Sequence, residues 1–137
     1  MEARGLVGIV VVSHSALIAE GIVELARQMS GPDLRIVAAG GAIDGSLGTD
    51  ASRVAAAIEE ADGGSGVLVL ADLGSAVLAA RTALELLGPD EAARVRISRG
   101  PVVEGAVVAA VQASIGDTLD DVVATADAAA GLDKLAG

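Results

Sequence analysis

The 137-residue sequence contains no cysteine, phenylalanine, tyrosine or tryptophan, and only one histidine. The absence of cysteine excludes disulfides and thiolate chemistry. The absence of aromatic residues means that Val, Leu, Ile and Ala must form the core, although 53% of the residues are hydrophobic. This composition favours a parallel sheet covered by helices, because the central strands of such sheets are continuous β-branched runs.

Long apolar runs and a basic charge are also absent. No apolar run approaches the ~18 residues that span a membrane, and we find no signal-peptide cleavage site. The 19 acidic and 9 basic residues give a net charge of −10, which disfavours binding to nucleic acid or to anionic membranes. The acidic surface either serves solubility alone or attracts a partner with a basic patch. We expect a cytoplasmic protein with a single domain over residues 1–137, a core over about 5–130 and a tail over 131–137.

Segments with strand character alternate with segments of helical periodicity along the chain. Strands are predicted at 6–13, 34–39, 67–71 and 94–98. Helices are predicted from Ser15 to Gly31, after Asp50, between Ser75 and Gly88, after Pro101 and over 118–130. This alternation predicts an α/β fold with a doubly wound, mainly parallel sheet and helices on both faces.

The spacing of the apolar residues predicts which face of each helix is buried. The predicted inner residues are Ile18, Ile22, Leu25 and Met29 in the first helix, Val54, Ala57, Ile58 and Ala61 in the second, Val77, Ala80, Leu84 and Leu87 in the third, and Val107, Val108, Val111 and Ile115 in the fourth.

Polar and glycine-rich residues are concentrated in four strand-to-helix junctions, at 13–15, 40–50, 72–75 and 98–104. In open parallel sheets, ligands bind outside the carboxyl ends of the strands. We therefore expect the functional site at that edge, with Asp72 on the strand beside the one that ends at His14.

Common catalytic motifs do not fit these junctions. A P-loop requires a lysine, but the single lysine is Lys134, and S-H-S stands where a dinucleotide fingerprint requires G-x-G-x-x-G. One histidine without cysteine cannot form the usual zinc site, and the first junction lacks the acidic cluster of a receiver domain. No G-x-S-x-G elbow marks a serine nucleophile. We expect no metal site in this chain.

The interpretation that remains is that His14 acts as a nucleophile. One imidazole nitrogen can attack phosphorus while an acceptor, best supplied by Asp72, holds the other nitrogen. The phosphoryl group would lie near the start of the first helix, where N–H groups and the helix dipole favour an anion. The hydroxyls of Ser13, Ser15 and Ser75 and the amides of the glycine-rich loop could donate to it.

Purely structural interpretations of the same residues stay open at this point. His14 could be a helix cap or a surface residue, and Asp72 could cap the third helix while also orienting the ring. The segment 40–48 could be only a loop. Glu104 is better explained by stabilising the start of the fourth helix than by acid–base chemistry.

Four segments, GIVVVSHSALIAEGIVELARQM, LGTDASRV, GVLVLADLGSAVLAARTALELL and GPVVEGAVVAAV, appear in the order and spacing of a known family. Over about residues 5–130 the chain resembles the phosphotransferase subunit of phosphoenolpyruvate-dependent dihydroxyacetone kinase. The domain of that subunit is similar to the mannose-type enzyme IIA of the bacterial sugar phosphotransferase system.

The resemblance implies a role for each matching residue. His14 would accept and donate the phosphoryl group through the nitrogen distal to Asp72, and Asp72 would orient the ring. The residues expected to line the phosphate are Ser13, Ser15, Gly40, Gly41, Gly48, Thr49, Gly74 and Ser75. The implied fold is doubly wound and mannose-type enzyme IIA-like, usually in a homodimer.

The resemblance also implies partners. HPr would donate the phosphoryl group, and ADP on the nucleotide-binding subunit of dihydroxyacetone kinase would accept it. Mg²⁺ and ADP would belong to that subunit, so we expect no cofactor in this chain. Arg99 is a bulky charge near the predicted site and could contact either phosphate or a partner surface. The alternatives are a mannose-type IIA domain that donates to a IIB domain and a regulatory module that transfers no phosphate.

Overall fold

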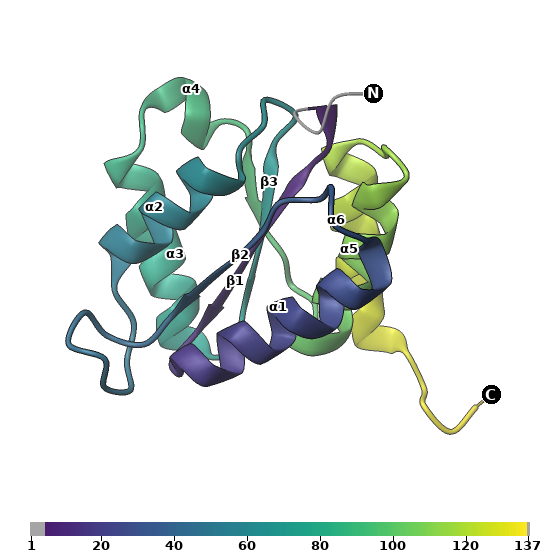
Figure 1. The fold of residues 1–137 in the computed structure, drawn as a ribbon, viewed down its shortest axis with the longest axis horizontal. Helices are drawn as coiled ribbons and strands as arrows, with labels where there is room; N and C mark the ends of the chain where they lie inside the picture. The colour runs from purple at the N-terminus through teal and green to yellow at the C-terminus, as the bar shows by residue number, and fades with distance from the viewer. Residues whose placement is uncertain (1–4, 137) are drawn as a thin grey trace.

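The strands form one parallel sheet in the order β2-β1-β3-β4 (Figure 1). The computed structural model describes residues 5–136; the remainder of the predicted domain, residues 1–4 and 137, lies outside them. The strands are β1 (Gly8–Ser13), β2 (Ile36–Gly40), β3 (Val67–Ala71) and β4 (Val95–Ile97). The prediction of a parallel sheet with the third strand beside the first is confirmed.

Strand β1 lies in the middle of the sheet, and all six of its residues are buried. Its last residue, Ser13, is in register with Gly40 of β2, and Val12 is in register with Ala71 of β3. This register brings the carboxyl ends of three strands to one level, so the residues that follow them share one edge.

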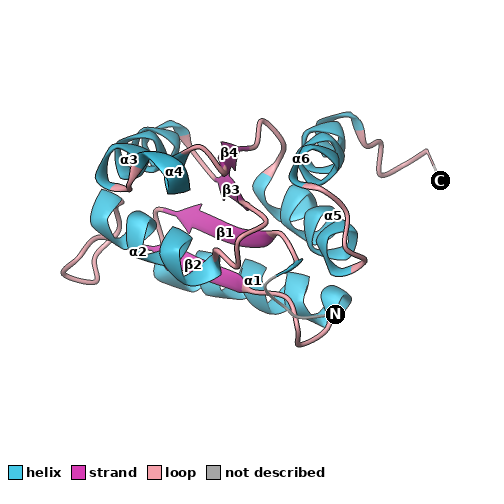
Figure 2. Cartoon of the chain, turned by 90° about the horizontal axis from the view of Figure 1, so that it is seen from above, coloured by secondary structure: helices cyan, strands magenta, loops and turns pink. Residues whose placement is uncertain are grey.

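Helices cover both faces of the sheet, as predicted (Figure 2). On one face lie α1 (Ala16–Ser30), α5 (Val102–Ser114) and α6 (Leu119–Ala128), and on the other lie α2 (Ala51–Ala61) and α3 (Gly74–Leu86). Because side chains alternate along a strand, β1 sends Ile9 and Val11 into the first core and Val10 and Val12 into the second.

The predicted inner faces of α1 and α5 are largely wrong. In α1 the buried residues are Ala19, Ile22 and Ala26, whereas Ile18, Leu25 and Met29 are 52%, 44% and 57% exposed. In α5 the buried residues are Gly105, Ala106, Ala109, Ala110 and Ala113, while Val111 and Ile115 are exposed and Val107 and Val108 are partly exposed.

Close helix packing explains this difference. A Cβ on Gly40 would come within 2.9 Å of the Cβ of Ala19, so α1 and β2 approach too closely for a large side chain between them. A Cβ on Gly105 would come within 2.6 Å of Leu70 of β3. The small residues and Ile22 therefore meet the sheet, and the other large aliphatic residues of these two helices stay partly or fully exposed.

The other two predicted faces had different outcomes. All four predicted residues of α2 are buried, which confirms that face. In α3 the buried residues are Ala76, Ala79, Ala80 and Ala83, so of the predicted set Ala80 is correct. Leu84 and Leu87 pack against this core only partly buried.

Two further features differ from the sequence prediction. A short helix, α4 (Pro89–Ala92), precedes β4 where a simple break was expected. The last helix ends at Ala128, and a 3₁₀ turn (Ala129–Gly131) follows. Beyond that turn Lys134 forms an ion pair with Glu104, in the first turn of α5, at 2.7 Å. Within residues 5–136 no helix is both long and apolar enough to cross a membrane.

The packing of β1 against α2 can be tested at Gly8. A Cβ there would overlap the backbone carbonyl of Ala61, so Gly8→Ala should lower the free energy of unfolding by about 3 kcal/mol. Gly21→Ala is the matched control: nothing lies within 4 Å of its added Cβ, and it should raise that free energy by about 1 kcal/mol. Urea denaturation followed by circular dichroism measures both, and an unchanged Gly8→Ala variant would contradict the close approach.

Candidate active site

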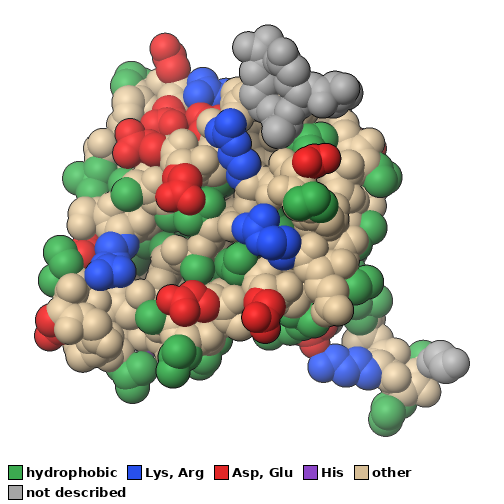
Figure 3. Space-filling model, in the orientation of Figure 1, with side chains coloured by type: hydrophobic (Ala, Val, Ile, Leu, Met, Phe, Trp, Pro, Cys, Tyr) green, Lys and Arg blue, Asp and Glu red, His purple; other side chains and the backbone are tan. Residues whose placement is uncertain are grey.

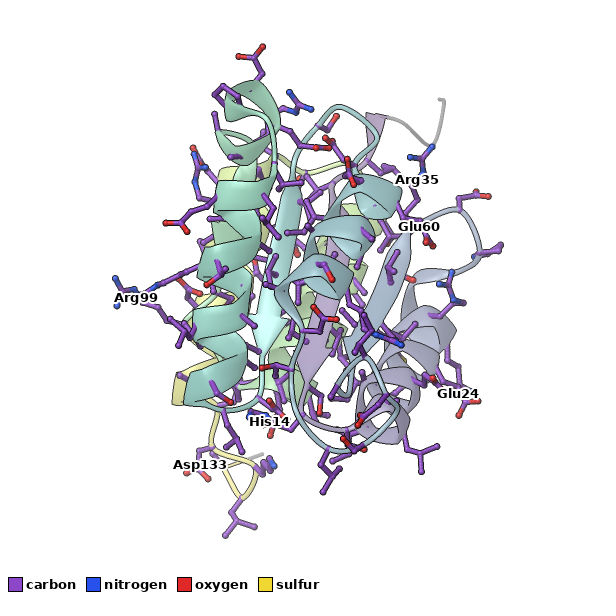
Figure 4. The ribbon with its side chains drawn as sticks, turned by 90° about the vertical axis from the view of Figure 1, so that its left-hand side faces the viewer. His14, Glu24, Arg35, Glu60, Arg99 and Asp133 are labelled. Atoms are coloured by element: carbon purple, nitrogen blue, oxygen red, sulfur yellow. The ribbon has the colours of Figure 1, made fainter. Side chains whose placement is uncertain are left out.

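His14 connects the end of β1 to the start of α1. Ser13 closes the strand, and Ser15 caps the helix by accepting a hydrogen bond from the Ile18 N–H at 3.2 Å. The His14 side chain is 27% exposed. Figure 4 places it at the edge of the sheet where the parallel strands end. The ring is thus held between two regular elements and still reaches solvent.

Asp72 follows β3 and contacts the His14 ring. The distance from its Oδ1 to Nδ1 of His14 is 3.0 Å. Oδ1 also accepts the Leu73 N–H at 2.8 Å. Oδ2 accepts the Ser13 hydroxyl at 2.7 Å and the His14 backbone N–H at 3.2 Å. Four donors therefore surround one carboxylate that is only 15% exposed.

These donors set the charge of the carboxylate. Burial by itself would raise the pKa of Asp72, but the hydrogen bonds from Ser13, His14 and Leu73 outweigh burial and lower it. Asp72 is therefore ionised at neutral pH. Since an ionised carboxylate only accepts hydrogen bonds, Nδ1 carries the proton in this contact, and in the neutral form of the ring the lone pair is then on Nε2.

Nε2 faces the start of α3. The Ser75 hydroxyl, in the first turn of that helix, contacts Nε2 directly. No side chain caps α3, whose N-cap is Leu73. Uncapped N–H groups and the positive end of the helix dipole favour an anion there. Nε2 thus faces the start of α3, whereas the start of α1, where the sequence suggested that the phosphoryl group would lie, is capped by Ser15.

The glycine-rich segment 41–49 packs against the backbone around His14. The Gly41 N–H donates to the Ser13 carbonyl at 3.2 Å, and the Gly48 N–H donates to the His14 carbonyl at 2.8 Å. Both glycines have positive φ, which favours glycine at these positions. These two amides are engaged by carbonyls and do not point at Nε2.

Two of the predicted phosphate-lining residues lie beside Nε2, and the others have structural contacts elsewhere. Gly74 and Ser75 lie at the start of α3 beside Nε2. Ser13 is completely buried against Asp72, and Ser15 caps α1. Gly40 packs against the start of α1, and Thr49, partly exposed, precedes the α2 cap Asp50.

Arg99 lies at the end of β4 and is exposed, and in Figure 4 its side chain extends away from His14. Its backbone N–H donates to Asp127 Oδ1 at 2.8 Å. The sequence did not suggest Asp127, because this residue lies within α6 and not at one of the four strand-to-helix junctions. No cluster of three or more potential metal-binding side chains occurs within residues 5–136.

The profile of a protein family described as the PTS system fructose IIA component (EIIA-man) matches residues 8–123. This chain belongs to that family. Membership confirms the resemblance found in the sequence and the mannose-type enzyme IIA-like fold.

Members with curated names are similar to this chain over most of its length. It is 46% identical over 121 residues to "PEP-dependent dihydroxyacetone kinase, phosphoryl donor subunit DhaM" of Escherichia coli (strain K12), covering 86% of this chain and 26% of the relative. It is 38% identical to "PEP-dependent dihydroxyacetone kinase 2, phosphoryl donor subunit DhaM" of Listeria innocua, covering 86% of this chain and 94% of the relative. The chain thus spans about a quarter of the first relative and nearly all of the second.

A solved structure of similar size has the same fold. The crystal structure of a protein of unknown function, EF1359, is 38% identical and covers 93% of this chain and 94% of its own, with a TM-score of 0.80. The enzyme IIA fold therefore extends over nearly the whole chain.

Acid titration tests the charge of Asp72. Because its pKa is lowered on folding, its ionised form stabilises the protein above the unfolded value of about 3.9, and this contribution is lost as the pH falls through the folded value. Asp72→Asn lacks the titrating group. The difference in free energy of unfolding between wild type and variant, from urea denaturation, should shrink between about pH 5 and pH 2.5. The same difference at both pH values would contradict the assignment.

Proposed function

We propose that this chain is a phosphoryl carrier. Nε2 of His14 accepts the group from phospho-HPr and passes it to ADP on the nucleotide-binding subunit of dihydroxyacetone kinase. The observation that carries the proposal is the ring geometry: an ionised Asp72 holds Nδ1, and Nε2 faces the uncapped start of α3. Relatives named as phosphoryl donor subunits of this kinase support the choice of acceptor.

In the first transfer, the lone pair of Nε2 attacks the phosphorus of the donor phosphohistidine. The Nε2–P bond forms as the donor's P–N bond breaks, and the electron pair of that bond returns to the donor ring. The His14 ring becomes a cation because Nδ1 keeps its proton, and Asp72 stabilises this charge at 3.0 Å. The phosphoryl oxygens meet the Ser75 hydroxyl and the first N–H groups of α3.

In the second transfer, a terminal phosphate oxygen of ADP attacks the same phosphorus. The Nε2–P bond breaks, its electron pair returns to Nε2, and ATP forms on the partner subunit. ADP and Mg²⁺ belong to that subunit, and this chain contributes no cofactor. Its own residues orient the ring and hold the anion by position and charge.

Two partners must reach the same nitrogen in turn. Three segments next to the site in the chain carry exposed apolar side chains that a partner could contact. These are Leu17 at the start of α1, Leu47 in the glycine-rich segment and Leu73 before α3. Figure 3 shows acidic, basic and hydrophobic side chains interspersed on the face that it presents. A net charge of −10 favours encounter with a donor that carries a basic patch.

A second acceptor is favoured by the family description, which names a sugar phosphotransferase component. In that case the phosphoryl group passes to a IIB domain, by the same chemistry at His14. A regulatory module would be phosphorylated at His14 and would pass the group to neither acceptor.

The test is phosphorylation in a reconstituted system. With phosphoenolpyruvate, enzyme I and HPr, the wild type should gain an acid-labile, base-stable phosphate, and His14→Ala should gain none because it lacks the nucleophile. Addition of the kinase's nucleotide-binding subunit with ADP should then produce ATP. A wild type that stays unmodified would refute the carrier role, and transfer to a IIB domain alone would select the second acceptor.

We also propose that the chain forms a homodimer through α1 and α5, which pack side by side. Their outward faces carry Ile18, Leu25 and Met29 on α1 and Val111 and Ile115 on α5, all exposed. Apolar side chains in this number favour burial against a second copy.

Sedimentation of a charge variant tests the dimer. Leu25→Glu with Met29→Glu should convert a dimer into a monomer, because two carboxylates would be desolvated at the interface. Leu78→Glu with Leu86→Glu places the same charges on exposed positions of α3, on the opposite face of the sheet, and should leave the dimer intact. A monomeric wild type would exclude the dimer.

A further inference from the structure

The end of β1 carries three hydrogen bonds that join a serine, an aspartate and the next two residues. The Ser13 hydroxyl donates to Asp72 Oδ2 at 2.7 Å and accepts the Ser15 N–H at 3.1 Å. The intervening residue, His14, donates its backbone N–H to the same Asp72 oxygen at 3.2 Å. Ser13 is completely buried, so water cannot replace its hydroxyl without a rearrangement.

The end of β4 repeats this arrangement with other residues. The Ser98 hydroxyl donates to Asp127 Oδ1 at 2.6 Å and accepts the Gly100 N–H at 2.9 Å. The intervening Arg99 donates its backbone N–H to the same oxygen at 2.8 Å. Ser98 is 9% exposed, so both serine hydroxyls are buried against a carboxylate.

The two strand ends differ in what the aspartate does next. At β1 the second carboxylate oxygen holds the His14 ring at 3.0 Å. At β4 the Arg99 side chain extends outward (Figure 4). The Ser98–Asp127 pair there binds the backbone of residues 99 and 100 and holds no histidine ring. The β4 arrangement therefore shows what this hydrogen-bond pattern does without a catalytic ring, and it provides an internal control for β1.

We propose that Ser13 is a positioning residue for phosphoryl transfer that acts through Asp72, an inference that rests on the proposed function. Its hydroxyl and the His14 N–H hold Oδ2 from two directions, which fixes the plane of the carboxylate. Oδ1 is then directed at Nδ1. The sequence had placed the Ser13 hydroxyl among the phosphate donors, but in the structure it lies behind the ring.

Loss of this hydroxyl has a specific chemical consequence. Without the Ser13 hydroxyl, Oδ2 keeps only the longer bond from the His14 N–H, at 3.2 Å, and Oδ1 keeps the Leu73 N–H. The carboxylate can then rotate about its Cβ–Cγ bond, with Oδ1 still bound to Leu73, and loosen its contact with Nδ1. The ring proton is then free to move to Nε2. A ring with its proton on Nε2 has no lone pair there and cannot attack phosphorus.

The experiment compares Ser13→Ala with wild type by two measurements. ¹⁵N NMR of the ring at a pH well above 7 reports which nitrogen carries the proton. The signals are unambiguous, because His14 is the one histidine and the chain has no aromatic residue. The variant should shift its tautomer population toward Nε2–H, and the rate of phosphorylation by phospho-HPr should fall about tenfold, as for other groups that orient a functional histidine.

Two further variants separate positioning from stability. Ser98→Ala removes the equivalent buried hydroxyl–carboxylate bond at β4 and should keep the wild-type tautomer and rate. Ser13→Thr restores a hydroxyl and should recover the Nδ1–H tautomer. The proposal is overturned if Ser13→Ala keeps the wild-type tautomer, or if Ser98→Ala loses as much rate as Ser13→Ala. If wild type accepts no phosphate, the carrier role fails, and the ring measurement still decides whether Ser13 sets the tautomer.

Discussion

The hydrogen bond between Asp72 Oδ1 and His14 Nδ1 is the interaction on which the site depends. Its two residues are 58 positions apart, and they meet because β3 lies directly beside β1 in a parallel sheet. The bond keeps the ring proton on Nδ1, and the ring orientation then presents Nε2 to the start of α3. A single contact thus links the topology of the sheet to the chemistry of one nitrogen atom.

Opposing effects decide the charge of Asp72. Burial favours the neutral acid, but the carboxylate accepts four hydrogen bonds, and these lower its pKa. Two of the donors are backbone N–H groups of His14 and Leu73, which the ends of β1 and β3 hold in place. The negative charge of Asp72 is therefore fixed by the edge of the sheet, next to Nδ1 of the His14 ring.

Small residues determine how the helices meet the sheet. Alanine and glycine on α1, α3 and α5 allow close approach, and the large aliphatic side chains of the same helices, except Ile22, are left partly or fully exposed. The helices α1 and α5 therefore contribute mainly alanines to the first core, whereas α2, whose predicted inner face is correct, contributes Val54 and Ile58 to the second. The exposed aliphatic side chains leave the molecule with apolar surface on several sides.

The sequence by itself determined the parallel sheet, the position of β3 beside β1 and the edge at which His14 and Asp72 meet, because continuous apolar runs and strand–helix alternation permit few topologies. Only the tertiary structure decided which faces of α1, α3 and α5 are buried, since periodicity reports hydrophobicity and not the distance between a helix and a sheet. It also decided that Ser13 donates to Asp72, that the Gly48 amide binds the His14 carbonyl, and that Asp127 closes the end of β4. Each of these bonds joins residues separated by 29 or more positions in the chain, and their direction follows from packing that no local pattern encodes.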